Sequence, residues 1–137
     1  MSLPTTEVVS EGQHIDVRTP TDAASFLLNG QSAAIDAVRA AAHSISRASH
    51  RMAVAVGSNN SLHYAAAGSS GLMALADASE LRGTFGIPSD KIHIHMAGGV
   101  PVDAHMPGET EDSDEAVERI SEKITADDVV IVLTASG

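Results

Sequence analysis

The chain has 137 residues, enough for one domain with a hydrophobic core. Because only 2% of the residues are aromatic, we expect aliphatic side chains and alanine to form that core. A formal net charge of −10 with scattered basic residues argues against nucleic acid or an anionic membrane as a partner. Without cysteine the chain has no disulfides, thiolate metal ligands or thiolate nucleophile, and we expect a cytoplasmic protein.

The N-terminal part of the chain predicts an extended arm and two helices. Residues 1–20 are polar and lack periodicity, which is typical of an arm. Thr21 is suited to cap a short helix that ends at the Asn29–Gly30 pair. Apolar residues then recur at helical spacing over residues 31–52, so we expect a second helix whose alanine-rich face packs against a neighbour or a second copy.

Strands and helices alternate in the rest of the chain. We expect strands over residues 61–67, 91–96 and 129–134, and helices over residues 72–81 and from 113 or 114 to 123. This alternation predicts a three-layer α/β/α fold with a parallel sheet and right-handed crossovers, preceded by the N-terminal helices. Three strands make a narrow sheet with exposed edges, so we expect a sheet that is incomplete in this chain or is completed by oligomerisation.

A turn rich in glycine and serine joins the first strand to the helix that follows it. Gly68 and Gly71 allow the backbone to approach a ligand closely, and Ser69 and Ser70 add hydroxyl donors to the outward-pointing amides of the first helical turn. The pattern predicts a phosphate site, although a helix cap with a tight turn has the same composition. It matches neither the dinucleotide fingerprint nor the nucleotide-triphosphate loop.

Histidines and acidic residues give weaker candidates. His93 and His95 lie on one face of a predicted strand, and His63 or His105 could approach them in space. Because the spacing provides no evident third ligand, we expect histidines that are hydrogen-bonded or exposed to solvent rather than a metal site. The acidic run over residues 109–118 is expected to form a solvated loop and the start of a helix.

Several segments together resemble one family. They are Tyr64-Ala-Ala-Ala-Gly-Ser-Ser-Gly71, Asp77-Ala-Ser-Glu80, Thr84-Phe-Gly86 and Met96-Ala-Gly-Gly99. In this order they resemble the N-acetylmuramic acid 6-phosphate etherases, a branch of the sugar isomerase (SIS) domain superfamily. The resemblance covers roughly residues 21–137, about the first half of a family member.

This resemblance implies a phosphosugar-binding domain over residues 21–137 that cleaves the lactyl ether of an amino-sugar 6-phosphate without a metal or an organic cofactor. It implies that Glu80 is the catalytic base, which removes the C2 proton before lactate leaves C3 and water adds there. It also implies a site shared between subunits of a homodimer or higher oligomer. The substrate-binding residues that it implies are Gly68, Ser69, Ser70, Gly71 and Ser136.

Two differences from the family leave other functions open. Leu72 stands where the family has an arginine, and the sequence ends at Gly137, before the family's next Arg-Thr-Pro. We therefore expect a fragment or truncated product that turns over slowly by itself. An aldose–ketose phosphosugar isomerase would use the same turn and carboxylate, whereas a sugar-phosphate sensor or an oligomerising module would use no catalytic base.

Overall fold

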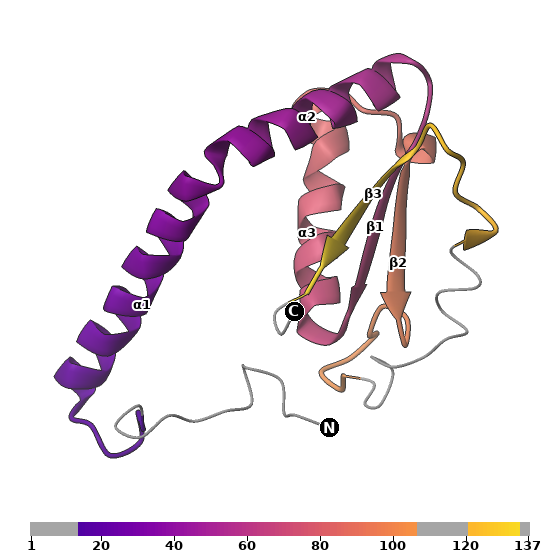
Figure 1. Ribbon diagram of the computed structural model, residues 1–137. Coiled ribbons are helices and arrows are strands. Elements are labelled where there is room, and N and C mark those ends of the chain that lie inside the picture. The colour runs from indigo at the N-terminus through magenta and orange to yellow at the C-terminus, as the bar shows by residue number, and fades with distance from the viewer. Residues whose placement is uncertain (1–13, 107–120, 135–137) are drawn as a thin grey trace, which may run out of the picture. The chain divides into compact units, whose positions relative to one another are not determined.

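The computed structural model describes residues 14–106 and 121–134 (Figure 1). The chain divides into two compact units, with the boundary between Ser49 and His50 inside the second helix. The elements in chain order are α1 (Pro20–Ala40), α2 (Ala42–Gly57), β1 (Leu62–Ala67), α3 (Gly68–Phe85), the short 3-10 helix η2 (Ser89–Lys91), β2 (Ile92–Ala97) and β3 (Val129–Leu133). Among the helices in these ranges, none is both long and apolar enough to cross a membrane.

The first helix begins and ends at different residues from those predicted. Thr19, rather than Thr21, is the N-cap, and its hydroxyl accepts a hydrogen bond from the amide of Asp22 at 3.2 Å. The helix continues through Gly30 and stops at Ala40, so the predicted end at Asn29–Gly30 is wrong. One interior glycine costs a helix only about 1 kcal/mol relative to alanine, and the good helix formers on both sides of Gly30 outweigh it.

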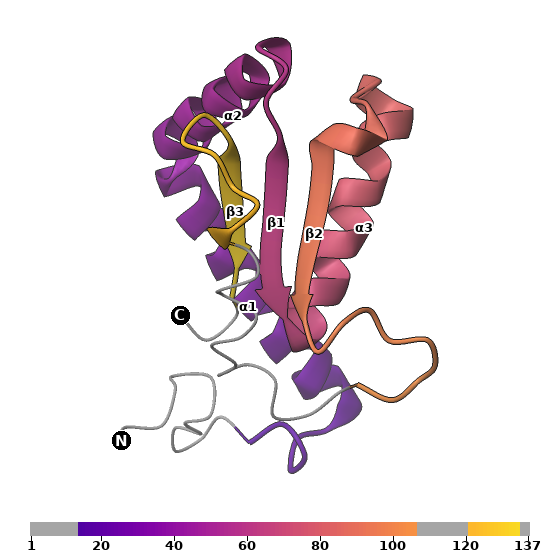
Figure 2. The ribbon, with the colours of Figure 1, turned by 90° about the vertical axis from the view of Figure 1, so that its right-hand side faces the viewer.

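The three strands form one parallel sheet in the order β2-β1-β3. Leu62 of β1 pairs with Ile92 of β2 and with Val129 of β3, so the strands start level and all end at the same edge of the sheet (Figure 2). The α/β class and the parallel sheet preceded by N-terminal helices are confirmed. The helix predicted from residue 113 or 114 to 123 lies mostly outside the described residues.

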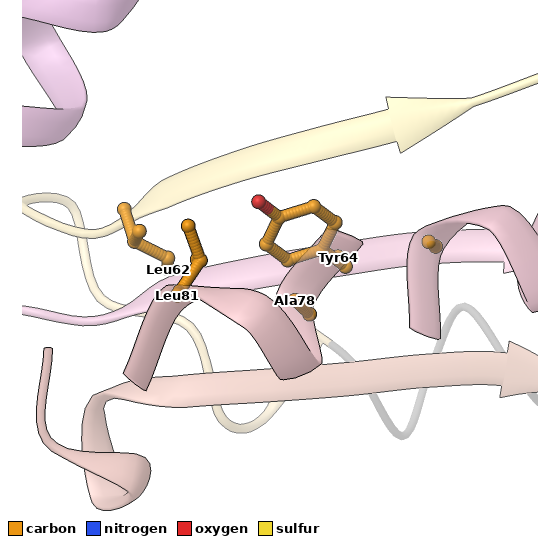
Figure 3. Close-up of a cluster of buried hydrophobic side chains, with 5 residues drawn as sticks. Leu62, Tyr64, Ala78 and Leu81 are labelled. Carbon is orange, nitrogen blue, oxygen red and sulfur yellow. The ribbon is translucent and has the colours of Figure 1, made fainter. Parts of the chain in front are cut away.

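The core lies between α3 and one face of the sheet (Figure 3). Leu62 and Tyr64 of β1 are 1% and 2% exposed and pack against Ala74, Ala78 and Leu81 of α3. The small alanines allow the helix to approach the strand closely, as the composition predicted. Met52 and Val56, from the end of α2, pack against the same cluster, and Ala55 between them is buried.

The opposite face of the sheet is partly exposed to solvent. α3 lies on the other side of the sheet in Figure 2, and Val130 and Val132 of β3 are 42% and 69% exposed. Because side chains alternate along a strand, His63 of β1 lies on this face between the core residues Leu62 and Tyr64. Unlike the valines, His63 is only 2% exposed.

Candidate functional site

The glycine- and serine-rich segment is the first turn of α3, not a loop before it. Ala67 is the N-cap in extended conformation and makes no side-chain capping hydrogen bond, and α3 starts at Gly68 with a φ of 53°. A positive φ favours glycine, which explains this residue at the sharp junction between β1 and α3. The amides of the first helical turn have no acceptor within the helix, and here no side chain caps them from Ala67.

The serines of this turn differ in accessibility. Ser69 is exposed and Ser70 is half-buried, and both lie at the edge where β1 and β2 end. A ligand outside this edge would meet the positive end of the α3 dipole together with two hydroxyl groups. The turn therefore lies at the predicted edge of the sheet, although the helix starts at Gly68 rather than at the predicted residue 72.

Gly71 has a packing role that the sequence analysis missed. A Cβ atom at this position would lie 2.6 Å from Cγ and 2.7 Å from Sδ of Met96. Any side chain at residue 71 would therefore require the Met96 side chain to move, because contacts this short are not tolerated. Gly71 is buried, so the Met96 side chain fills the space beside it whether or not the backbone of Gly71 also meets a ligand.

Glu80 lies far along the same helix. It is exposed, and its nearest polar contact is the hydroxyl of Thr84, which is 3.5 Å from Oε2. At a rise of 1.5 Å per residue, Glu80 is about 15 Å along the axis from Ser70. One hexose 6-phosphate does not span this distance, so a single chain does not bring the predicted base and the predicted phosphate turn to one sugar.

Asp77, whose role the sequence left open, accepts a hydrogen bond from a buried tyrosine. The hydroxyl of Tyr64 donates to Oδ2 of Asp77 at 2.7 Å and so ties the middle of α3 to β1. Burial, followed by the hydrogen bond to Asp77, raises the pKa of Tyr64, so the phenol stays protonated and keeps donating. A buried tyrosine needs a partner for its hydroxyl group, and the exposed Asp77 provides it; the sequence carries no local signal for this pairing.

The outward face of α3 is unusually apolar. Leu72 and Met73 are 40% and 69% exposed, and Ala76 is also exposed, on a helix whose other side packs on the sheet. A helix that is apolar on both sides is typical of one that is covered on both sides. Glu80 belongs to the same exposed part of α3.

The remaining predicted candidates lie elsewhere. Ser136 and the acidic run over residues 109–118 are outside the described residues. Within residues 14–106 and 121–134, no group of three histidines and carboxylates is arranged to hold a metal ion. His93 and His95 instead stack against His63, and Nε2 of His95 is hydrogen-bonded to Nδ1 of His63.

Comparison with known proteins identifies relatives of the chain. No family model matches it. The N-acetylmuramic acid 6-phosphate etherase of Geobacillus thermodenitrificans is 30% identical over 137 residues, which is 98% of this chain and 46% of the etherase. The chain is homologous to the N-acetylmuramic acid 6-phosphate etherases. The resemblance to this SIS-domain family in the motifs is therefore confirmed.

Two further etherases show the same partial coverage. That of Clostridium acetobutylicum is 31% identical over 137 residues, or 98% of this chain and 45% of the etherase. That of Thermobifida fusca is 41% identical over 76 residues, which is 56% of this chain and 25% of the etherase. The chain spans less than half the length of these relatives.

Proposed function

We propose that the chain binds a phosphorylated amino sugar at the N-terminus of α3. The observation that carries the proposal is the first turn of α3, which presents serine hydroxyls and amides without a side-chain cap at the carboxyl edge of the sheet. A phosphate dianion there is stabilised by the helix dipole and by charge-assisted hydrogen bonds. Homology to the etherases supports an amino-sugar 6-phosphate as the ligand.

The proposed reaction is the removal of lactate from N-acetylmuramic acid 6-phosphate. In the open-chain sugar the C1 aldehyde makes the C2 proton acidic, and the carboxylate of Glu80 takes this proton. The electron pair forms the C2–C3 double bond as the C3–O bond breaks, and lactate leaves as its oxygen takes a proton from the solvent. Water then adds its hydroxyl to C3 and releases its other proton to the solvent, while Glu80 returns the first proton to C2 and ends the cycle as a carboxylate.

This reaction requires Glu80 and the phosphate turn to meet, so we place the site between two copies of the chain. Ser69 and Ser70 of one copy would hold the phosphate, while Glu80 of the other copy would face the C2–C3 bond. The exposed Leu72 and Met73 support this arrangement, because a second copy would remove them from water. Such contact would also desolvate Glu80, which a general base near neutral pH needs.

The N-terminal helices offer a second surface for self-association. A groove of about 560 Å³ runs along α1 and the start of α2, lined mainly by Ala34, Ile35, Val38, Ala42 and Ile45. Ile35 and Val38 are 54% and 58% exposed. Sedimentation velocity tests the proposed homodimer: we expect a mass above that of one chain, and a monomer mass at every concentration would contradict it.

A sensor without catalysis is the second candidate. Leu72 stands at the position of the family's arginine, so the turn holds its ligand with hydroxyls and amides but with one charge fewer. A phosphosugar isomerase would use the same residues to move a proton between C1 and C2. Product analysis separates the three: lactate indicates the etherase, a ketose phosphate indicates the isomerase, and binding without turnover indicates the sensor.

Replacing Ser70 with alanine tests the binding site. Loss of one hydrogen bond to a charged ligand costs about 1.5–3 kcal/mol, so we expect calorimetric titration with N-acetylmuramic acid 6-phosphate to show about 10- to 150-fold weaker binding. Ser79→Ala is the matched control, because Ser79 lies on the same helix and donates to the carbonyl of Leu75 at 2.6 Å. No heat with the unaltered chain, or equal affinity in both variants, would contradict the proposal.

A further inference from the structure

Three histidines form a stack on the sheet face opposite α3. The ring centroid of His63 in β1 is 4.6 Å from that of His93 and 5.2 Å from that of His95, both in β2. The planes of His63 and His95 differ by 5° and those of His63 and His93 by 25°. His63 lies in the middle of this histidine stack and is 2% exposed, so it has almost no access to water.

The hydrogen bond inside the histidine stack requires at least one neutral ring. Nδ1 of His63 is 2.9 Å from Nε2 of His95, which means that one nitrogen carries a proton and the other offers a lone pair. If both rings became imidazolium, two N–H groups would face each other and the bond would be lost. Two positive charges would then lie about 5 Å apart in a poorly solvated place.

The second nitrogen of His63 makes no hydrogen bond, although it lies within ion-pair distance of Asp128. Its Nε2 is buried without a hydrogen bond, and Oδ2 of Asp128 is 3.6 Å away, beyond hydrogen-bonding distance. Asp128 is engaged elsewhere, because its oxygens accept hydrogen bonds from Ser61 and Thr125. A proton added to His63 would therefore be stabilised by the charge of Asp128 but not by a direct hydrogen bond.

Burial and the neighbouring basic groups together outweigh the carboxylate of Asp128 at the histidine stack. Burial, followed by His93, lowers the pKa of His63 from its ordinary value of 6.5, and Asp128 only partly opposes this. Burial also lowers the pKa of His95, with further contributions from the other two histidines and from Lys123. β3 presents valines to this face and adds no charge.

We propose that the histidine stack is a pH-sensitive clasp between β1 and β2, closed when its rings are neutral and weakened when protons bind. The unfolded chain would take up these protons more readily than the folded one. The stabilisation is therefore fully present above pH 6.5 and is lost as the pH falls below it. Below pH 6.5, each histidine that titrates raises the unfolding equilibrium constant by up to about tenfold for every unit by which the pH falls.

The histidine stack is next in sequence to a residue that contacts the N-terminus of α3. His95 precedes Met96, and the side chain of Met96 occupies the space beside Gly71 in the first turn of α3. Loosening β2 from β1 would therefore alter the contact of Met96 with the first turn of α3. This link involves the fold alone and holds whether or not the turn binds a sugar phosphate.

Urea unfolding between pH 5 and pH 8 tests the clasp. For the unaltered chain we expect the unfolding constant to rise steeply as the pH falls below 6.5. His95→Gln should show a clearly shallower rise, because the glutamine amide can still donate to Nδ1 of His63 but cannot take up a proton. His50→Gln, at an exposed position of α2, is the control and should keep the unaltered profile.

Two outcomes would overturn the proposal. One is a flat profile for the unaltered chain, and the other is an equally steep profile in His95→Gln. If His95→Gln does not fold, an NMR titration of the imidazole protons in the unaltered chain decides the matter. We expect His63 and His95 to titrate below pH 6.5, and titration of both at or above 6.5 would overturn the clasp.

Discussion

Replacing Glu80 with glutamine is expected to lower the release of lactate from N-acetylmuramic acid 6-phosphate by about 10²- to 10⁴-fold, the range that a general base contributes. Glutamine keeps the size and polarity of the side chain but cannot accept the C2 proton. The affinity for the sugar phosphate should change little, because Ser69 and Ser70 of the other copy still hold the phosphate and glutamine has nearly the size of glutamate. Steady-state lactate assays combined with calorimetric titration measure both quantities.

The matched control for Glu80 is Glu122→Gln, another exposed carboxylate in the described residues. It should leave the release of lactate unchanged. Mixing the Ser70→Ala and Glu80→Gln chains provides a second control, because a site shared between copies would regain part of its activity in mixed pairs. Equal turnover by Glu80→Gln and the unaltered chain would contradict the assigned role of Glu80.

Replacing Asp128 with alanine should produce a large loss of stability, because this side chain joins the segment before β3 to the start of β1. Oδ1 accepts a hydrogen bond from the amide of Ser61 at 2.7 Å, and Oδ2 accepts two from the amide and hydroxyl of Thr125, both at 2.8 Å. The Asp128 side chain is 7% exposed. Removing it leaves the half-buried amide of Ser61 without its acceptor, whereas the exposed donors of Thr125 can turn to water, and we expect a loss of about 2 kcal/mol in the free energy of unfolding.

The charge of Asp128 predicts how this contribution depends on pH. The amide of Ser61, followed by that of Thr125, lowers the pKa of Asp128 from 3.8 to about 2. A carboxyl group with a lowered pKa stabilises the fold above its unfolded value, so the contribution persists above pH 3.8 and is lost as the pH falls towards 2. Urea unfolding at pH 7 and pH 3 measures the difference.

Asp127→Ala is the matched control for Asp128, because the neighbouring carboxylate is exposed. We expect a change within about 0.5 kcal/mol for this surface substitution. Asp128→Asn should fall between the two, since the amide oxygen still accepts hydrogen bonds but carries no charge. Equal unfolding midpoints for the two alanine variants would show that the Asp128 hydrogen bonds contribute nothing.

Local sequence patterns predicted the strands and the position of the turn well. The run Val129–Leu133 contains only branched aliphatic residues, and it forms a strand one residue shorter than predicted. The turn at residues 68–71 lies at the predicted carboxyl edge because the parallel order places all strand ends there. The predicted end of the first helix at Gly30 was wrong, because a single glycine weakens a helix without necessarily ending it.

The features that the sequence did not predict are contacts between elements. Gly71 and Met96 meet only because α3 crosses β2, and neither residue carries a local signal for the other. The pairing of His63 with His93 depends on the register between β1 and β2, which alternation within one strand cannot fix. The distance between Ser70 and Glu80 likewise follows from one unbroken helix that begins at Gly68, four residues before the predicted start.

The most direct test of the proposed phosphosugar site is NMR mapping of the backbone amides during a titration. We predict that N-acetylmuramic acid 6-phosphate shifts the signals of Ser69, Ser70 and Gly71 in a saturable manner, because these amides open α3. Unphosphorylated N-acetylmuramic acid should leave them in place at the same concentrations. Equal shifts with both sugars, or saturable shifts confined to other parts of the chain, would contradict phosphate binding at the N-terminus of α3.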